Sequence, residues 1–253
     1  MKIDLLTLYN YRNYNNLNLK LSSNINIFTG FNAQGKTNII EAIYFSSLGI
    51  SHRTRTEGDL ILWGKDEASI NVKFSKRDIN SILKIILKKN KRKELNFNGE
   101  IIKQKDLPGL LTMILFSPED LMLIKGSPLL RRRFIDIELS QISRIYYNEL
   151  VQYNRLLLQR NNLLKKIREN KKLIPMLDTW NEQIAKTAAF IVEKRLRGIE
   201  KLSKLAQKIH YEISQKMEML NIRYNIHNYK NETLNSFNDL FDFYIQALNK
   251  YRD

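Results

Sequence analysis

Residues 30–37, with the sequence GFNAQGKT, lie between two apolar runs, and this arrangement limits the folds that the chain can adopt. The first run, residues 25–28, is short and β-branched, which predicts a buried strand. The second run begins at Asn38 and places Ile39, Ile40, Ile43 and Tyr44 at helical spacing. The segment between them fits the pattern G-x-x-x-x-G-K-[ST] without a mismatch, so the sequence predicts a phosphate loop between a strand and a helix.

Each residue type in this loop has a chemical reason. Glycine allows positive φ and a close approach of the backbone to a ligand. Successive N–H groups and the N-terminus of the following helix can then bind a polyphosphate. Lys36 would bind the β- and γ-phosphates, and the Thr37 hydroxyl would hold Mg²⁺. An ordinary glycine turn is the alternative. The predicted nucleotide-binding residues are Gly30, Phe31, Asn32, Ala33, Gln34, Gly35, Lys36, Thr37 and Asn38.

Charge and composition narrow the classes of partner. The chain has 253 residues and is 43% hydrophobic, which supports a sizeable core. It contains no cysteine, which excludes disulfides and cysteine-based sites and fits a cytosolic protein. No apolar stretch approaches the roughly 20 residues that span a bilayer. The net charge of +16 favours a polyanionic partner, nucleic acid above an anionic membrane surface, although a lysine-rich solvated surface is the alternative.

Periodicity predicts strands in the first half of the chain and helices in the second. Candidate strands cover residues 2–11, 17–22, 68–74, 81–89, 93–102 and 111–116. The fourth and fifth would form a hairpin turning near Asn90, where a cluster of basic residues is either solvated or in contact with phosphate. From about residue 139, long helical patterns cover residues 139–170 and 175–217, which predicts an antiparallel hairpin or, alternatively, a plain helical bundle. Residues 221–229 are a further candidate strand and residues 238–253 a helix.

Four segments together resemble one family: YRNYNNLNLKL, GFNAQGKTNIIEAIYFSSLGISHRT, FSPEDLMLIKGSPLLRRRFIDIEL and YNELVQYNRLLLQRNNLLK. They are similar to the bacterial RecF family of DNA replication and repair ATPases, which is related to SMC-type proteins. The resemblance runs along the whole chain. It implies an α/β fold, a P-loop ABC-type ATPase head in residues 1–138, and an α-helical hairpin lid in residues 139–253. It also implies ATP and Mg²⁺ as cofactors, an ATP-dependent homodimer, gapped or junction DNA, RecO and RecR as partners in RecA loading, and a cytoplasmic location.

The resemblance also assigns expected roles to several basic residues. Arg12 would lie near the nucleotide, with a surface arginine as the alternative, and Arg53 would face DNA or nucleotide. Arg131, Arg132 and Arg133 would contact phosphate or pair with Glu138 and other carboxylates at the base of the lid. Lys89 and Arg92, in the basic turn, are further candidates for DNA contact.

Two elements of an ABC-type ATPase are missing from the sequence pattern. We find no Walker B strand ending in two acidic residues and no serine-glycine signature loop. Glu119 and Asp120 follow an apolar run but are separated from it by Ser117 and Pro118. The chain therefore resembles an N-terminal portion of the family, with no catalytic residue assigned and no hydrolysis expected. The rival interpretations are an ABC transporter ATPase subunit and a non-enzymatic DNA-binding module whose P-loop is a phosphate clamp.

Overall fold

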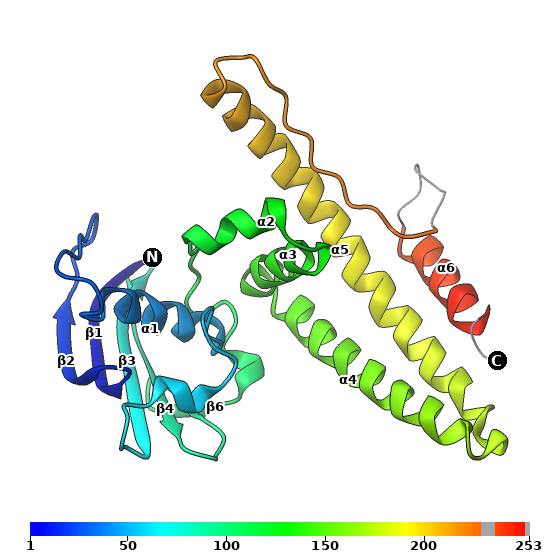
Figure 1. Cartoon of the computed structure of the whole chain (residues 1–253), viewed down its shortest axis with the longest axis horizontal. Helices are drawn as coiled ribbons and strands as arrows, with labels where there is room; N and C mark the ends of the chain where they lie inside the picture. The colour runs from blue at the N-terminus through cyan, green and yellow to red at the C-terminus, as the bar shows by residue number, and fades with distance from the viewer. Residues whose placement is uncertain (229–235, 251–253) are drawn as a thin grey trace. The chain divides into compact units, whose positions relative to one another are not determined.

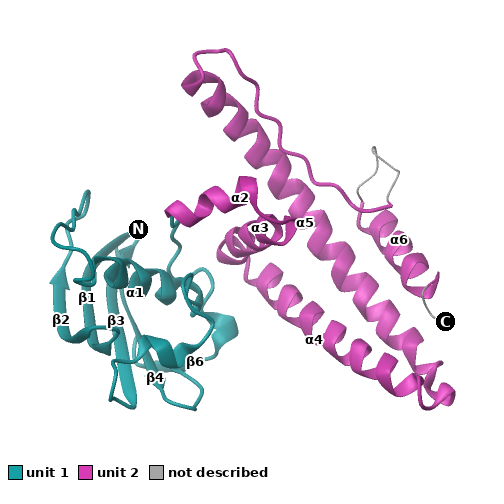
Figure 2. Cartoon of the chain, in the orientation of Figure 1, with its two compact units in different colours: residues 1–116 teal, residues 117–253 magenta. Residues whose placement is uncertain are grey.

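The computed structural model describes residues 1–228 and 236–250. It divides into two compact units, residues 1–116 (unit 1) and residues 117–253 (unit 2), coloured separately in Figure 2. Unit 1 holds the strands and one long helix, and unit 2 is helical (Figure 1). The expected division at residues 138/139 falls inside the helix α3 (Pro128–Ile142) of unit 2.

Unit 1 is built on one antiparallel sheet of six strands in the order β2-β1-β3-β4-β5-β6. The strands are β1 (Lys2–Tyr11), β2 (Tyr14–Lys20), β3 (Glu67–Lys76), β4 (Ile79–Lys88), β5 (Glu94–Phe97) and β6 (Glu100–Ile102). The predicted hairpin is confirmed, because Leu83 of β4 pairs with Phe97 of β5 in antiparallel register. Short loops connect most neighbouring strands, so the sheet is largely a meander of sequence neighbours.

Alternation along the strands gives the sheet an apolar inner face. Leu6, Leu8, Ile70 and Val72 are fully buried, as expected when every second side chain points to the same side. The helix α1 (Lys36–Leu48) packs its apolar side chains into the same core cluster. Asn10 has a φ of 47°, and this irregularity ends the alternation, so that the neighbouring Tyr11 is also fully buried.

Two strands predicted in unit 1 are absent from the structure. Residues 25–28 and 111–116 have no strand assignment, and neither segment has a neighbour in the sheet order. Ile25 and Ile27 are 78% and 80% exposed, and Ile114 and Phe116 are 80% and 84% exposed. These predictions were wrong because β-branched composition favours a strand only where another strand completes its hydrogen bonds.

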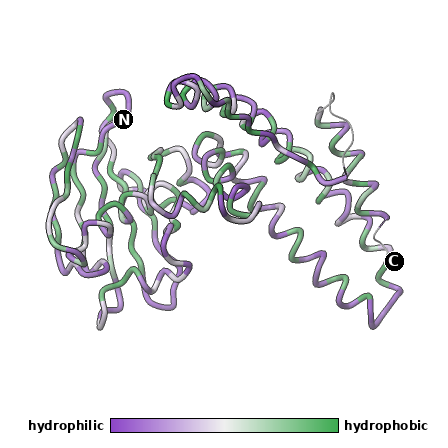
Figure 3. Tube along the Cα trace, turned by 45° about the horizontal axis from the view of Figure 1, so that its top comes forward, coloured by the Kyte–Doolittle hydropathy of each residue, from purple (hydrophilic) through white to green (hydrophobic). Residues whose placement is uncertain are grey.

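Unit 2 is built around two long antiparallel helices. It begins with the short helices η3 (Pro118–Leu121) and α2 (Met122–Lys125), followed by α3. The helices α4 (Arg144–Ile167) and α5 (Met176–Ile213) run side by side and are joined through η4 (Lys171–Leu173), as Figure 1 shows. The predicted helical hairpin is therefore confirmed, and α5, with 38 residues, is about 57 Å long. Along both helices polar and apolar residues alternate in patches (Figure 3).

The end of the chain returns along α5. The helix α6 (Phe237–Lys250) packs on α5 through a small cluster that contains Ala189, Val192 and Leu240. The prediction of a terminal helix is confirmed over its described part. Residues 221–228 form no strand, which corrects that prediction, and Tyr229, Tyr251, Arg252 and Asp253 lie outside the described residues. Ser203 of α5 accepts a hydrogen bond from the Ile222 backbone N–H at 3.2 Å, so this segment pairs with a helix side chain instead of a strand.

A polar cluster joins the helices of unit 2. Asp136 on α3 accepts two hydrogen bonds from Arg195 on α5, both at 2.8 Å, and a third from the Tyr146 hydroxyl on α4 at 2.5 Å. Arg195 also donates to the Tyr224 hydroxyl at 3.0 Å. Burial is the main cause of the raised pKa of Tyr146. Nearby, a Cβ at Gly198 of α5 would lie 3.1 Å from Leu139 of α3, so glycine at this position lets the two helices approach closely.

Candidate nucleotide site

The loop of residues 30–37 has the backbone conformation that its glycines predict. Gly30, Ala33 and Gly35 have φ values of 140°, 64° and 97°. Gly35 is the N-cap of α1, and a Cβ there would lie 2.6 Å from Asn13 Oδ1 and 2.8 Å from the Tyr14 hydroxyl. The positive φ therefore favours glycine at this position, and a Cβ would also have to displace the ends of the Asn13 and Tyr14 side chains.

Lys36 lies across this loop. Its ammonium donates hydrogen bonds to the backbone carbonyls of Gly30 at 2.8 Å and Phe31 at 2.6 Å. No acidic residue lies in the first turn of α1, so the partial positive charge of the helix N-terminus is not neutralised there. Thr37, next in the chain, is exposed. The loop thus places a cation, an exposed hydroxyl and a helix N-terminus together, which is the arrangement that binds polyphosphate.

Two asparagines brace the loop from the side. Asn13, in the turn between β1 and β2, donates to the Gln34 carbonyl at 3.2 Å. Asn38 donates to Asn13 Oδ1 at 2.8 Å and accepts from Arg53 at 2.8 Å. The structure therefore connects Arg53 to the phosphate loop through two side chains, and the role of Asn38 in binding nucleotide stays a prediction.

Glu41 is a central residue of this region that the sequence analysis missed. It is fully buried in α1 and accepts hydrogen bonds from Arg12 Nε at 2.9 Å, Arg12 Nη2 at 2.7 Å and the Ser51 hydroxyl at 2.6 Å. Arg53 Nη1 lies 3.6 Å from the same carboxylate. Burial alone would raise the pKa of Glu41, but the hydrogen bonds from Arg12 and Ser51 outweigh it and the pKa is lowered. The available signal was a carboxylate inside the apolar sequence NIIEAIYF.

Arg12 and Arg53 differ in exposure and in how many of their hydrogen-bond donors are already used. Arg12 has a φ of 52°, and its third nitrogen, Nη1, donates to the Asp59 carbonyl at 2.9 Å. Its pKa is raised, chiefly by the hydrogen bond to Glu41. The Arg12 side chain is 20% exposed and that of Arg53 is 44% exposed. Arg12 therefore braces α1 against its neighbouring loops, and Arg53 is the more accessible of the two arginines.

The remaining predicted basic contacts are spread over both units. Lys89 and Arg92 are exposed in the turn between β4 and β5. The neighbours of that turn, Lys88 and Lys93, are in ion pairs with Glu94 and Glu57. The sequence therefore located the basic turn correctly, and the DNA contacts themselves stay a prediction.

In unit 2, Arg131 caps the end of α2. Its Nη1 donates to the carbonyls of Leu123 at 3.0 Å and Gly126 at 3.1 Å. Within residues 1–228 and 236–250, no ion pair joins Arg131, Arg132 or Arg133 to Glu138, and burial raises the pKa of that carboxyl. The pairing alternative for these arginines therefore finds no support in the described residues.

Asp120 is used as a helix cap. Its carboxylate accepts from the Ser117 backbone N–H at 2.7 Å and from the Ser117 hydroxyl at 3.2 Å, which stabilises the start of η3. In the described part of the chain, no group of three or more His, Asp or Glu side chains could hold a metal ion. No described helix is long and apolar enough to cross a membrane.

Comparisons with known proteins identify the family. The family model described as "AAA domain" matches residues 5–245. The "DNA replication and repair protein RecF" of Clostridium botulinum (strain ATCC 19397 / Type A) is 44% identical over 225 residues, which are 88% of this chain and 61% of that protein. The RecF of Clostridium perfringens (strain SM101 / Type A) is also 44% identical, over 62% of its length. The chain belongs to the RecF family.

Solved RecF structures match the fold as well as the sequence. The structure titled "Structure of the recombination mediator protein RecF-ATPrS in RecFOR pathway" superposes with a TM-score of 0.92 at 30% identity, covering 99% of this chain and 67% of that one. A second, with RecF-ATP in its title, has a TM-score of 0.90 over the same shares. The predicted RecF-like P-loop ATPase head with a helical hairpin is thus confirmed. The chain spans 61% of the length of the first RecF relative.

Proposed function

We propose that the chain is an ATP-binding and DNA-binding protein of DNA repair and recombination. The observation that carries this proposal is the loop at the start of α1, where Lys36 lies across a backbone turned by Gly30 and Gly35. The RecF-ATP and RecF-ATPrS structures that resemble the chain support nucleotide as the ligand. ATP is the proposed cofactor, with Mg²⁺.

The residues of the loop fit this nucleotide. Lys36 would exchange its two carbonyl partners for the β- and γ-phosphate oxygens, and backbone N–H groups of residues 33–37 would bind the phosphates. Thr37, exposed beside Lys36, would hold the Mg²⁺, which neutralises phosphate charge when it is bound. The Arg12–Glu41 pair keeps α1 and the turn carrying Asn13 in place, and Asn13 in turn holds the loop through the Gln34 carbonyl.

The DNA part of the proposal rests on charge and on the family. A net charge of +16 suits a phosphate backbone, and we propose contacts from Arg53, Lys89, Arg92, Arg131 and Arg132. Membership of the RecF family supports gapped or junction DNA as the partner, together with RecO and RecR, ATP-dependent homodimerisation and a cytoplasmic location. Hydrolysis is not part of the proposal for this chain, because its 253 residues contain no Walker B or signature sequence.

Titration with a fluorescent ATP analogue tests the nucleotide site. Lys36→Ala removes the cation, and a charged hydrogen bond is worth about 1.5 to 3 kcal/mol, so the affinity should fall at least tenfold. Lys65→Ala, which changes an exposed lysine in another turn, is the matched control and should bind normally. Equal affinity of the Lys36→Ala and parent chains would show that residues 30–37 are only a turn.

DNA retention with and without nucleotide separates the remaining interpretations. Retention that increases with ATP supports the proposed function. DNA retention that is the same with and without nucleotide would favour a non-enzymatic module whose P-loop is a phosphate clamp. If the chain does not bind DNA even at low salt, the DNA-binding role is contradicted.

A further inference from the structure

The outer face of the unit 1 sheet carries an unusual set of side chains. On this face Leu5 lies between Lys20 and Lys73, and Thr7 lies between Asn18 and Asn71. Farther across the sheet, Asn71 pairs with Lys84. The next row contains Asn16, Tyr9 and Ser69. Asparagine is depleted in strands because its side chain competes for backbone hydrogen bonds, yet two of the four strands in these rows, β2 and β3, place it on the outer face.

Among the described residues, three lysines on this face have no partner for their positive charge. Lys20, Lys73 and Lys84 are exposed, and none forms an ion pair or a side-chain hydrogen bond within the described part of the chain. The acidic residues of the face include Asp4, which pairs with Lys2 at 3.0 Å, Glu94, which pairs with Lys88 at 2.6 Å, and the exposed Glu67, which lies opposite Lys88 at the start of β3. A surface that serves only solubility normally intersperses both signs. The three unpaired lysines therefore favour an anionic ligand.

Strand geometry gives the spacing of these cations. Lys20 and Lys73 are two strands apart, which is roughly 10 Å, and Lys73 and Lys84 are diagonal neighbours about 7 to 8 Å apart. One nucleic-acid strand carries a phosphate about every 3.4 Å along the duplex axis. The three ammonium groups can thus reach several successive phosphates. The amides of Asn16, Asn18 and Asn71 add neutral donors of the kind that bind phosphate oxygens.

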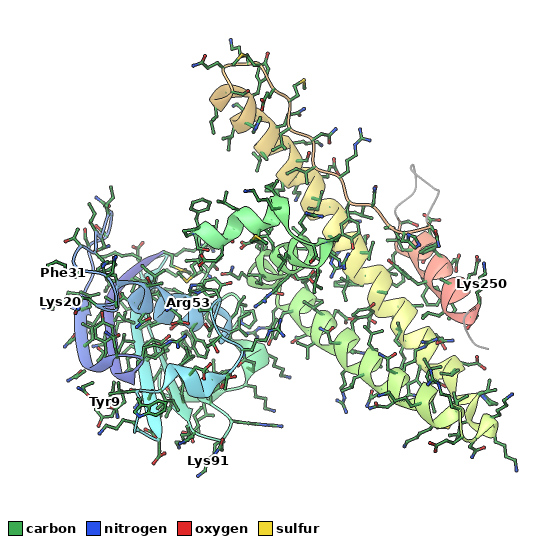
Figure 4. All side chains as sticks on the ribbon, viewed as in Figure 1. Tyr9, Lys20, Phe31, Arg53, Lys91 and Lys250 are labelled. Carbon is green, nitrogen blue, oxygen red and sulfur yellow. The ribbon has the colours of Figure 1, made fainter. Side chains whose placement is uncertain are left out.

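We propose that the outer face of the sheet, defined by Lys20, Lys73, Lys84, Asn18 and Asn71, is a binding surface for the nucleic-acid phosphate backbone. It is separate from the phosphate loop and from the turn of Lys89 and Arg92. Tyr9, 53% exposed at the edge of this set, offers a ring on which a base of a single strand can stack. Figure 4 shows Lys20 and Tyr9 on the adjacent strands β2 and β1. This surface deepens the proposed function and rests on its DNA-binding part.

Salt-dependent binding of a labelled DNA duplex tests the surface. The triple variant Lys20→Gln/Lys73→Gln/Lys84→Gln removes three charges and retains polar, unbranched side chains. Each lost phosphate contact lowers the slope of log affinity against log salt by about 0.9, so the slope should become shallower by roughly 2 to 3. The matched control, Lys165→Gln/Lys186→Gln/Lys208→Gln, removes three exposed lysines from unit 2 and should leave a steeper slope than the sheet variant. Circular dichroism and a thermal melt verify that both variants fold.

The outcomes separate this inference from the proposed function. Equal slopes for the parent chain and the sheet variant, with DNA still bound, would overturn the sheet surface alone. No DNA binding by the parent chain would overturn both. Anionic phospholipid vesicles provide a second probe: vesicle binding that depends on these lysines while DNA binding does not would also overturn the inference. Tyr9→Leu should weaken binding of a single strand and leave duplex binding unchanged.

Discussion

Replacement of Glu41 by glutamine should destabilise unit 1 strongly. Glu41 is fully buried and holds Arg12 through two hydrogen bonds of 2.9 and 2.7 Å. The Arg12 side chain is only 20% exposed, so the variant leaves a largely desolvated guanidinium without its anion. Removing one partner of a buried ion pair costs about 3 to 5 kcal/mol. For a unit of this size, that loss corresponds to a drop in Tm on the order of 10 °C or more.

The assay is urea denaturation followed by circular dichroism, at several pH values. The folded-state pKa of Glu41 lies below its ordinary value of 4.5. Its contribution to stability is therefore fully present above pH 4.5 and is lost as the pH falls through the folded-state pKa. The difference in the free energy of unfolding between the parent chain and Glu41→Gln should be constant near pH 7 and should become smaller in acid.

Two further variants make this reasoning refutable. Arg12→Met combined with Glu41→Leu removes both charges and should be more stable than Glu41→Gln alone, because no unpaired charge stays buried. Glu200→Gln removes one partner of the exposed Glu200–Lys204 pair on α5 and should change stability little. A loss below about 1 kcal/mol for Glu41→Gln would show that the Arg12–Glu41 pair is effectively solvated.

Three other predictions concern the loop, the helices and hydrolysis. Gly35→Ala should reduce both stability and nucleotide affinity, measured by melting and titration, because a Cβ would lie 2.6 Å from Asn13 at a φ of 97°; normal binding would contradict the required close approach. Glu138→Gln should raise Tm at pH 7, because burial raises the pKa of this carboxyl and so penalises its charged form; the advantage should disappear at acid pH, where the carboxyl is protonated. Phosphate release with ATP, Mg²⁺ and DNA should not exceed that of a Lys36→Ala blank, and clear turnover would make Glu119 and Asp120 the leading catalytic candidates.

Local patterns predicted the parts of the fold that depend on sequence neighbours. The β4–β5 hairpin, the helix after the phosphate loop and the long pair α4 and α5 could all be predicted, because their hydrogen bonds are formed within one helix or between consecutive strands. Residues 25–28 and 111–116 could not, since a strand also requires a neighbour that local composition does not reveal.

The site was predictable to a similar extent. The loop of residues 30–37 follows from a motif whose residues are consecutive. The role of Glu41 depends on Arg12 and Ser51, which lie 29 and 10 residues away and meet it only in the folded chain. An acidic residue within an apolar helix indicates a buried partner, but periodicity alone does not say which cation supplies it.

The contacts of Lys36 have a consequence for how quickly a ligand binds. Its ammonium is held by the carbonyls of Gly30 and Phe31, so a ligand that needs this cation must wait for those two bonds to open or must displace them. If opening comes first, the observed association rate levels off at high nucleotide concentration, at the opening rate of the loop. The apparent affinity is then reduced by the fraction of molecules in which the loop is open. Stopped-flow mixing over a wide concentration range would reveal that plateau, whereas a rate that rises linearly throughout would indicate direct displacement.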